Sequence, residues 1–220
     1  MGSQDFMLEQ IMEKMNAGFT CIKLKIGAID FEKELELLRF IRAHFTASQM
    51  EIRVDANGAF AYMEALSKLS QLAEFELHSI EQPIKNGQPD KMAKLCLETP
   101  LPIALDEELI GCVNIEDKAN LLDRIAPQFI ILKPSFVGGF AGTQEWIDLA
   151  QERGIGWWIT SALESNVGLN AIAQWTHTLN PDMPQGLGTG ALYTNNIDAP
   201  LVVENGALWY DPKKGWGPMP

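Results

Sequence analysis

Six short, largely apolar segments recur along the chain, and each ends in a charged or hydroxyl residue. They are residues 21–25, 51–55, 78–81, 103–106, 129–133 and 157–161. Their final polar residues follow one another at intervals of 25 to 30 positions. Apolar runs of this length are typical of strands that are buried on both faces, as in a parallel sheet. The regular spacing constrains the fold more than any other feature of the sequence.

Amphipathic helical patterns occupy the intervals between these segments. Examples are residues 31–45, 62–77 and 143–153, in which apolar side chains recur three or four positions apart. Strand and helix that alternate at this spacing indicate βαβ units with parallel strands. The predicted fold class is therefore α/β.

Two parallel architectures can accommodate these strands. An open, doubly wound sheet binds its ligand at one switch point, whereas a (β/α) barrel brings the carboxyl ends of all its strands to one mouth. Five successive strands end here in a charged residue. Burying each of these charges separately would be costly, and a shared mouth of acids and lysines removes that cost. The pattern therefore favours a (β/α) barrel.

The strand count is smaller than the eight of a complete barrel. Six strands are clear, and a Gly-rich segment near 186–192 is a weaker candidate for a seventh. The chain opens with a predicted helix, for which Ser3 is a candidate N-cap and Gly18 a candidate C′ residue. Because such a helix should follow a strand, we expect strand 1 to be absent. We assign residues 1–192 to an incomplete barrel domain that begins at helix 1.

The C-terminal part of the sequence has a different pattern. Residues 201–210 are predicted to form a hairpin around Asn205-Gly206, a pair typical of type I′ turns. The tail that follows is rich in Gly and Pro and is predicted to be irregular. Residues 193–220 therefore form a C-terminal hairpin and tail after the barrel domain.

Charge and hydropathy exclude several classes of partner. Acidic residues outnumber basic ones by 29 to 17, which gives a net charge of −12. Nucleic-acid-binding proteins usually carry a basic patch, and none is apparent here. No apolar run approaches the ~20 residues that span a bilayer, and no signal-peptide pattern is present. We expect no nucleic-acid or membrane partner and a cytoplasmic location, while an unpaired sheet edge would favour a homo-oligomer.

Three acids, Asp55, Glu81 and Asp106, end three consecutive predicted strands. Neighbouring strands lie about 4.8 Å apart, so these carboxylates can converge on one cation. Each acid taken alone could be a turn residue, but their shared position argues for a ligand set. Oxygen ligands suit Mg²⁺, with Mn²⁺ as an alternative. Asn57 and Glu107 adjoin the acids and are predicted to support them through hydrogen bonds, with ordinary loop bonding as the alternative.

Three lysines accompany the acids. Lys23 and Lys25 alternate on one predicted strand, so their side chains point to the same side. Lys133 ends a strand several units later and would lie across the mouth. A lysine beside a metal ion and a second ammonium group can give up its proton and act as a base. We predict Lys25 and Lys133 as catalytic groups, together with Lys23.

The sequences around these residues resemble the enolase superfamily, in its muconate-lactonizing-enzyme-like subgroup. The matching sequences are Lys23-Leu-Lys25, Val54-Asp-Ala-Asn57, Ile80-Glu-Gln-Pro83, Leu105-Asp-Glu107 and Leu132-Lys-Pro134. The match extends over about residues 19–191. The resemblance implies lysine and Mg²⁺ chemistry at the carbon next to a carboxylate. It also implies an N-terminal α+β capping domain, which we expect this chain to lack.

Residues 161–169, Ser-Ala-Leu-Glu-Ser-Asn-Val-Gly-Leu, resemble the o-succinylbenzoate synthase branch of that superfamily. By this resemblance, Ser161 and backbone amides near Gly138, Gly139 and Gly188 would hold the succinyl carboxylate of the substrate. Hydroxyl groups and the N–H groups at helix ends suit anions. The glycines around Gly188 could instead serve close packing at a strand end.

The function implied by the resemblance is that of a carbon–oxygen lyase. Lys25 would remove a proton α to a carboxylate, Lys133 would stabilise the resulting charge, and dehydration would give o-succinylbenzoate for menaquinone biosynthesis. The alternative is an N-succinylamino acid racemase or dipeptide epimerase with the same metal and lysines. A third interpretation is a catalytically incompetent barrel fragment, because a site without its cap admits water. In the two catalytic interpretations the partner is a small-molecule carboxylate.

Overall fold

The structure is a computed structural model that describes residues 4–189 and 193–218. Its helices are α1 (Gln4–Asn16), α2 (Phe31–His44), α3 (Tyr62–Ala73), α4 (Pro89–Glu98), α5 (Ile115–Ile125), α6 (Gly139–Glu152) and α7 (Asn166–Thr178). Its strands are β1 (Cys21–Lys25), β2 (Glu51–Asp55), β3 (Ser79–Glu81), β4 (Ile103–Leu105), β5 (Phe129–Leu132), β6 (Gly156–Ile159), β7 (Leu201–Glu204) and β8 (Ala207–Tyr210). None of these helices combines the length and apolar character needed to cross a membrane.

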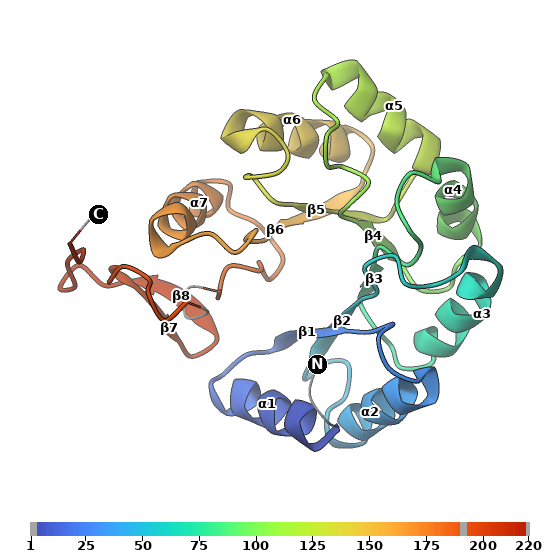
Figure 1. The fold of residues 1–220 in the computed structure, drawn as a ribbon, viewed down its shortest axis with the longest axis horizontal. Helices are drawn as coiled ribbons and strands as arrows, with labels where there is room; N and C mark the ends of the chain where they lie inside the picture. Colours follow the sequence, from blue (N-terminus) through green and yellow to red (C-terminus); the bar gives the residue numbers. More distant parts are fainter. Residues whose placement is uncertain (1–3, 190–192, 219–220) are drawn as a thin grey trace.

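Strands β1 to β6 form one sheet in which sheet neighbours are also sequence neighbours. Every pair is parallel. The sheet curves into an arc with the helices along its outer side (Figure 1). The predicted (β/α) barrel architecture is thus confirmed. Within the described residues the arc has six strands, and β1 pairs with β2 alone.

The six predicted strands are all present, with ends shifted by at most two residues. Two helix boundaries differ more from the prediction. Helix α3 ends at Ala73 because the chain then turns through Glu76, which has a positive φ of 49°. Helix α6 begins at Gly139, ahead of the predicted start, because Gly138 has a φ of 100° and reverses the chain there.

The weaker seventh strand near 186–192 is not formed over residues 186–189. Only a single parallel bridge, between Thr160 and Gly186, extends the sheet there. The remaining residues, 190–192, lie outside the described part of the chain, as does the candidate N-cap Ser3. A Gly-rich segment has too few side chains to bury for its pattern to define a strand.

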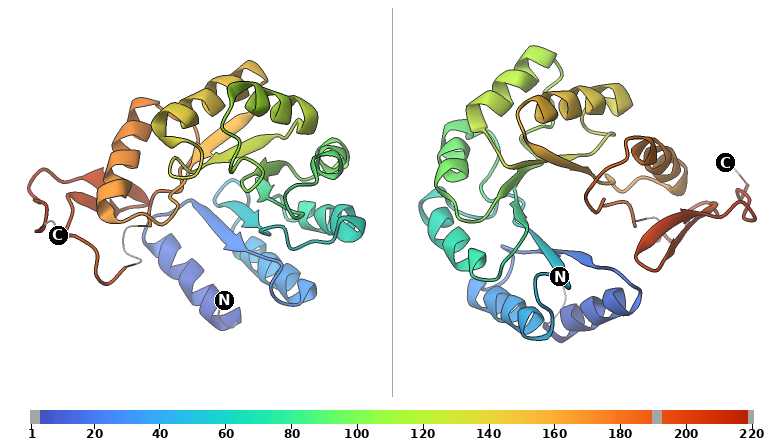
Figure 2. Two further views of the ribbon diagram at one scale, coloured as in Figure 1. Left: turned by 45° about the horizontal axis from the view of Figure 1, so that its top comes forward. Right: turned by 180° about the vertical axis from the view of Figure 1, so that it is seen from behind.

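The predicted C-terminal hairpin is confirmed. Strands β7 and β8 pair antiparallel, and both Asn205 and Gly206 have positive φ, as a type I′ turn requires. This turn lies so close to the turn between α1 and β1 that a side chain at Gly206 would collide with the Gly18 carbonyl oxygen. The hairpin therefore lies between α7 and the α1–β1 turn, as both views in Figure 2 show. The division at residue 192 remains a prediction.

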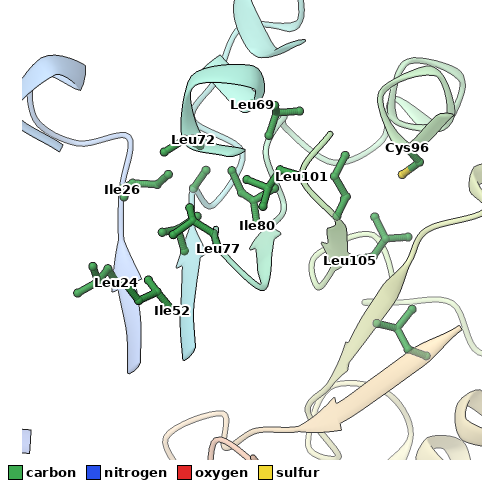
Figure 3. Packing of buried hydrophobic residues seen from close by; sticks show 14 of the residues in the cluster. Leu24, Ile26, Ile52, Leu69, Leu72, Leu77, Ile80, Cys96, Leu101 and Leu105 are labelled. Atoms are coloured by element: carbon green, nitrogen blue, oxygen red, sulfur yellow. The ribbon is translucent and has the colours of Figure 1, made fainter. Parts of the chain in front are cut away.

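The main hydrophobic core fills the layer between the sheet and the helices. Leu24, Ile52 and Ile80 of the strands belong to this core together with Leu69 and Leu72 of α3 (Figure 3). Side chains alternate across a strand. Lys25 follows the buried Leu24 and Asp55 follows the buried Val54, so these strand-end residues point to the inner side of the arc.

The inner side of the arc carries apolar side chains as well as the charged strand-end residues. Ala104, Ile131 and Trp158 form a small buried cluster on β4 to β6. Arg53 reaches this cluster from β2, with its guanidinium 4.2 Å from the centroid of the Trp158 ring. Its Nη1 atom donates to the Pro184 carbonyl at 3.1 Å. Arg53 therefore connects β2 to the chain segment beyond α7.

Candidate active site

The predicted acids lie side by side at the carboxyl end of the sheet. Lys25, Asp55 and Glu81 are in register across β1, β2 and β3. Asp106 directly follows β4. The three carboxylates are almost completely buried, with exposed fractions of 0% for Asp55 and 2% each for Glu81 and Asp106. Parallel strands thus bring together residues that are 25 or more positions apart in the sequence.

Each of these carboxylates is paired with a lysine. The Lys23 Nζ atom lies 2.9 Å from Asp55 Oδ2 and 2.8 Å from Glu81 Oε2. Lys25 Nζ lies 2.6 Å from Asp55 Oδ2. Lys133 forms an ion pair with Asp106. Three acids and three ammonium groups therefore form one nearly neutral cluster.

Asn57 and Glu107 lie at the edge of this cluster. Asn57 Oδ1 accepts a hydrogen bond from Lys25 Nζ at 2.5 Å, and Asn57 Nδ2 donates to Glu107 Oε1 at 3.0 Å. The Asn57 backbone N–H also donates to Asp55 Oδ1 at 3.0 Å. Asn57 is therefore placed to orient Lys25 and Asp55, and Glu107 in turn holds Asn57. Their supporting role at a metal site remains a prediction.

The carboxylate oxygens of this cluster are the ligand type that the predicted Mg²⁺ prefers. Glu81 Oε1 and Glu107 Oε2 are buried oxygen atoms without a hydrogen-bond partner among the described residues. A buried acceptor left unpaired is costly, and an oxygen-seeking cation would satisfy it. Yet no three acid, His or Cys side chains of the described residues are grouped to hold a metal, since Lys23 lies between Asp55 and Glu81. The residues thus fit Mg²⁺ in their chemistry, and the ligand geometry remains a prediction.

The charges shift the acid–base properties of the cluster. Burial disfavours the Lys23 ammonium, but Glu81 and Asp55 outweigh it and raise the pKa of Lys23. Burial alone would raise the pKa of Asp55, but Lys23 and Lys25 lower it. Burial, together with the neighbouring Asp55 and Asp106 carboxylates, raises the pKa of Glu81 to about 8 although Lys23 opposes this. Glu81 is therefore the acid that most readily holds a proton.

This raised pKa predicts a pH dependence of stability. Between its ordinary value of 4.5 and about 8, folded Glu81 holds a proton that the unfolded chain has released. The free energy of unfolding should therefore fall as the pH rises, by at most about 1.4 kcal/mol per pH unit from this group. Urea unfolding without divalent cations at pH 5.5 and 7.5 should show about 2 kcal/mol more loss in wild type than in Glu81→Gln. Equal losses in the two proteins would contradict the prediction.

The predicted substrate contacts are placed less favourably. Ser161 follows β6, and its hydroxyl donates to Glu164 Oε2 at 2.6 Å while accepting from the Leu163 N–H at 2.8 Å. The Gly139 amide donates to the Pro134 carbonyl at 2.8 Å. Gly188 is exposed, with open space around the position of a Cβ. The hydroxyl of Ser161 and the amide of Gly139 thus already have partners, and the carboxylate-binding role of this set remains a prediction.

Gly186 and Gly138 lie close to neighbouring atoms, whereas Gly188 does not. A Cβ atom on Gly186 would lie 2.7 Å from Thr160 Oγ1. Gly138 has a φ of 100° at the start of α6. The alternative role of packing at a strand end therefore suits Gly186, while Gly138 serves the turn into α6.

Glu164 was not predicted from the sequence, although its contacts are the densest in this region. Its carboxylate accepts from the Ser161 and Ser135 hydroxyls, each at 2.6 Å, and from the Ala162 N–H at 3.0 Å. Partial burial raises the pKa of Glu164, but the hydroxyl bonds from Ser135 and Ser161 give a net lowering. The Ser-x-x-Glu spacing of residues 161–164, which is that of a capping box, is the signal that could have identified it.

A pocket of about 250 Å³ lies beside this turn, lined by Leu163, Ser165, Tyr193, Asn195 and Asn196. None of the ion-paired lysines or acids lines it. The hollow and the charged cluster are therefore separate features, and the candidate chemistry belongs to the charged cluster.

Comparison with known proteins places these observations in a family context. The family described as enolase C-terminal domain-like matches residues 7–219. The o-succinylbenzoate synthase of Desulfotalea psychrophila is 60% identical over 208 residues, which are 94% of this chain and 56% of that protein. An N-succinylamino acid racemase from Amycolatopsis is 27% identical over 97% of this chain and 56% of its own length.

Solved structures show the same likeness. The crystal structure of MenC from Desulfotalea psychrophila superposes with a TM-score of 0.89 at 58% identity, over 94% of this chain and 57% of that one. Muconate lactonizing enzyme from Pseudomonas putida superposes with a TM-score of 0.82 at 25% identity, over 94% of this chain and 57% of that one. The chain thus spans a little over half the length of the relatives that it matches.

Proposed function

The chain belongs to the enolase C-terminal domain-like family, and on that premise we propose that it carries the catalytic barrel of an o-succinylbenzoate synthase. The observation that supports this most is the meeting of Lys25 and Lys133 with three buried carboxylates at one end of the sheet. The 60% identity to an o-succinylbenzoate synthase favours dehydration over other reactions of the family. The proposed substrate is 2-succinyl-6-hydroxy-2,4-cyclohexadiene-1-carboxylate.

Asp55, Glu81 and Asp106 would hold the metal. When bound, Mg²⁺ supplies a Lewis acid that draws electrons from the substrate carboxylate and acidifies the adjacent C–H group. The three acids would contribute only oxygen ligands, as this ion prefers. Removing the cation should therefore stop proton abstraction even though every lysine is still present.

Lys25 is the proposed base. Its side chain is 48% exposed at the mouth, so a substrate can reach the Nζ atom. In its neutral form Lys25 takes the α-proton, and the C–H electron pair passes toward the substrate carboxylate. When these electrons return, the β carbon–oxygen bond breaks, and the proton on Lys25 joins the departing hydroxide to give water.

Lys133 and Lys23 have different proposed roles. Lys133 follows β5 on the other side of the arc from Lys25, with a side chain that is 18% exposed. As an ammonium group it would stabilise the negative charge that develops on the substrate. Lys23 is bonded to two carboxylates that raise its pKa. It therefore suits the role of a fixed countercharge rather than that of a base.

The alternative is an N-succinylamino acid racemase or dipeptide epimerase. Two lysines on opposite sides of the mouth favour it, because inversion at carbon needs a proton donor on each face. Relatives with such names match this chain at 27% identity. Deuterium incorporation from solvent into a chiral N-succinylamino acid, with loss of optical activity, would identify that reaction.

A metal-dependent assay tests the proposed function. Wild-type protein should dehydrate the cyclohexadiene carboxylate, lose turnover on treatment with EDTA, and regain it with Mg²⁺. The same preparations, supplied with N-succinylamino acids, measure the alternative. Dehydration that persists after complete metal removal, or racemisation without any dehydration, would contradict the proposal. A protein that binds Mg²⁺ but turns over neither substrate would support the interpretation as an incompetent barrel.

A further inference from the structure

Glu164 connects two neighbouring strand ends at the mouth of the site. Strands β5 and β6 pair in parallel, with Leu132 opposite Ile159. Ser135 lies three residues beyond β5 and Ser161 two residues beyond β6. The hydroxyl groups of both serines donate to the carboxylate of Glu164, Ser135 to Oε1 and Ser161 to Oε2, each at 2.6 Å. One carboxylate thus holds both strand ends.

The turn that carries Glu164 is itself well fixed. Leu163 has a φ of 66°, a backbone conformation that costs energy for a residue with a side chain. The Tyr193 hydroxyl donates to the Leu163 carbonyl at 2.8 Å. Gly168 of α7 leaves room for the acid, because a Cβ there would lie 3.0 Å from Glu164 Cβ. The surroundings therefore hold the carboxylate in a single orientation.

Lys133 is close in sequence to Ser135, one of the two serines that bond to Glu164. The backbone N–H groups of Phe136 and Val137 donate to the Lys133 carbonyl at 2.8 and 3.2 Å, so the chain turns tightly after the lysine. Ser135 sits inside that turn. Holding the Ser135 hydroxyl therefore restrains the backbone that carries Lys133, and with it the origin of the ammonium side chain.

The groups that stabilise the charge of Glu164 differ from those that stabilise the three acids of the cluster. Asp55, Glu81 and Asp106 each pair with an ammonium group. Glu164 is instead stabilised by hydroxyl and backbone N–H groups, which lower its pKa, and it forms no salt bridge with a Lys or Arg side chain of the described residues. A carboxylate without a countercharge would repel an anionic substrate at this mouth, so its presence there needs a reason other than charge balance.

We infer that Glu164 is a positioning residue: by accepting hydrogen bonds from Ser135 and Ser161 it fixes the ends of β5 and β6, and thereby the Lys133 ammonium. The kinetic part of this inference rests on the proposed function. It also gives Ser161 another role, because a hydroxyl proton committed to Glu164 is not available to a substrate carboxylate.

The test compares Glu164→Ala, Glu164→Gln and Ser135→Ala with wild type. The control is Glu116→Ala, which removes an exposed acid from the first turn of α5 at the same end of the sheet. Turnover is measured well below the melting temperature, so that a loss of stability alone does not lower it. In Glu164→Ala kcat should fall about 10- to 100-fold with KM changed less than about threefold, because a displaced ammonium weakens the transition state more than binding.

The variants also differ among themselves in a defined way. The Gln side chain has only one acceptor oxygen and can keep only one of the two serine bonds. The kcat of Glu164→Gln should therefore lie between those of wild type and Glu164→Ala. Ser135→Ala should lose less than Glu164→Ala, and the double variant should lose no more than Glu164→Ala alone, because both act through one contact. Glu116→Ala should match wild type.

Amide hydrogen exchange gives a readout that needs no activity. Residues 135–138 and Ala162 should exchange about tenfold faster in Glu164→Ala than in Glu116→Ala. Unchanged exchange, unchanged kcat, or additive losses in the double variant would each overturn the inference. Absence of turnover in wild type would contradict the proposed function instead. The positioning role of Glu164 would then be tested by the exchange rates alone. Faster exchange in Glu164→Ala than in Glu116→Ala would support it, and equal exchange would overturn it.

Discussion

Replacing Lys25 with alanine should lower dehydration turnover by about 10²- to 10⁴-fold, the range typical of a lost general base. The expected loss is large because no other amine of the cluster can take over. Lys23 is held by Asp55 and Glu81 at 2.9 and 2.8 Å, and Lys133 forms its ion pair with Asp106 on the other side of the arc. Steady-state kinetics with saturating Mg²⁺ measure the effect.

Metal binding should survive this substitution, because Asp55, Glu81 and Asp106 are unchanged. Titration calorimetry with Mg²⁺ or Mn²⁺ on Lys25→Ala tests this and separates a lost base from a lost metal. Lys33→Ala is the matched control, since Lys33 is an exposed lysine of the first turn of α2. If Lys25→Ala kept the turnover of wild type, the assignment of the base would be wrong. If it lost metal binding as well, the kinetic loss would not identify a base.

The main features of this site could be predicted because they depend only on the alternation of side chains along each strand and on the regular spacing of the strands. Strand length and alternation place Leu24 and Val54 in the core, so the adjacent Lys25 and Asp55 must point inward. Parallel order then brings the ends of β1, β2 and β3 into register. No knowledge of individual side-chain contacts is needed for that step.

The contacts within the site could not be predicted in the same way. Lys23 and Lys25 occupy equivalent positions in the alternating pattern, and only the structure shows that Lys23 bridges two acids whereas Lys25 reaches Asn57. The choice depends on side-chain length and on the depth of each carboxylate. Ser161 was predicted to bind the substrate carboxylate, and the sequence did not reveal that its hydroxyl donates a hydrogen bond to Glu164, three residues later.

Contacts between side chains of distant segments could not be predicted from the periodicity of the sequence. Arg53 bonds to the Pro184 carbonyl, 131 positions away. Lys118 shares the buried face of α5 with Leu122 and Ile125 and is only 1% exposed, while its partner Glu145 belongs to α6. Such pairings depend on which distant segments pack together, and the sequence of one segment alone does not contain that information.

Lys118 provides the second large expected effect. Its Nζ atom lies 2.7 Å from Glu145 Oε2 and 3.1 Å from the Gly142 carbonyl, and 5.5 Å from the centroid of the Trp146 ring. Glu145→Ala would leave a buried ammonium without its countercharge, which typically costs about 3–5 kcal/mol. Because Glu145 is 43% exposed, water can replace part of the interaction, and we expect the free energy of unfolding to fall by about 2–3 kcal/mol.

The opposite substitution should be milder, which makes the cause testable. Lys118→Met removes the buried charge but keeps a long apolar chain beside Trp146, and Glu145 can turn to solvent, so the loss should stay below about 1 kcal/mol. Urea unfolding of both variants measures the difference, with Glu152→Ala on the exposed face of α6 as a control that should change stability by less than about 0.5 kcal/mol. Equal losses in Lys118→Met and Glu145→Ala would mean that lost packing, rather than an unpaired charge, destabilises the α5–α6 interface.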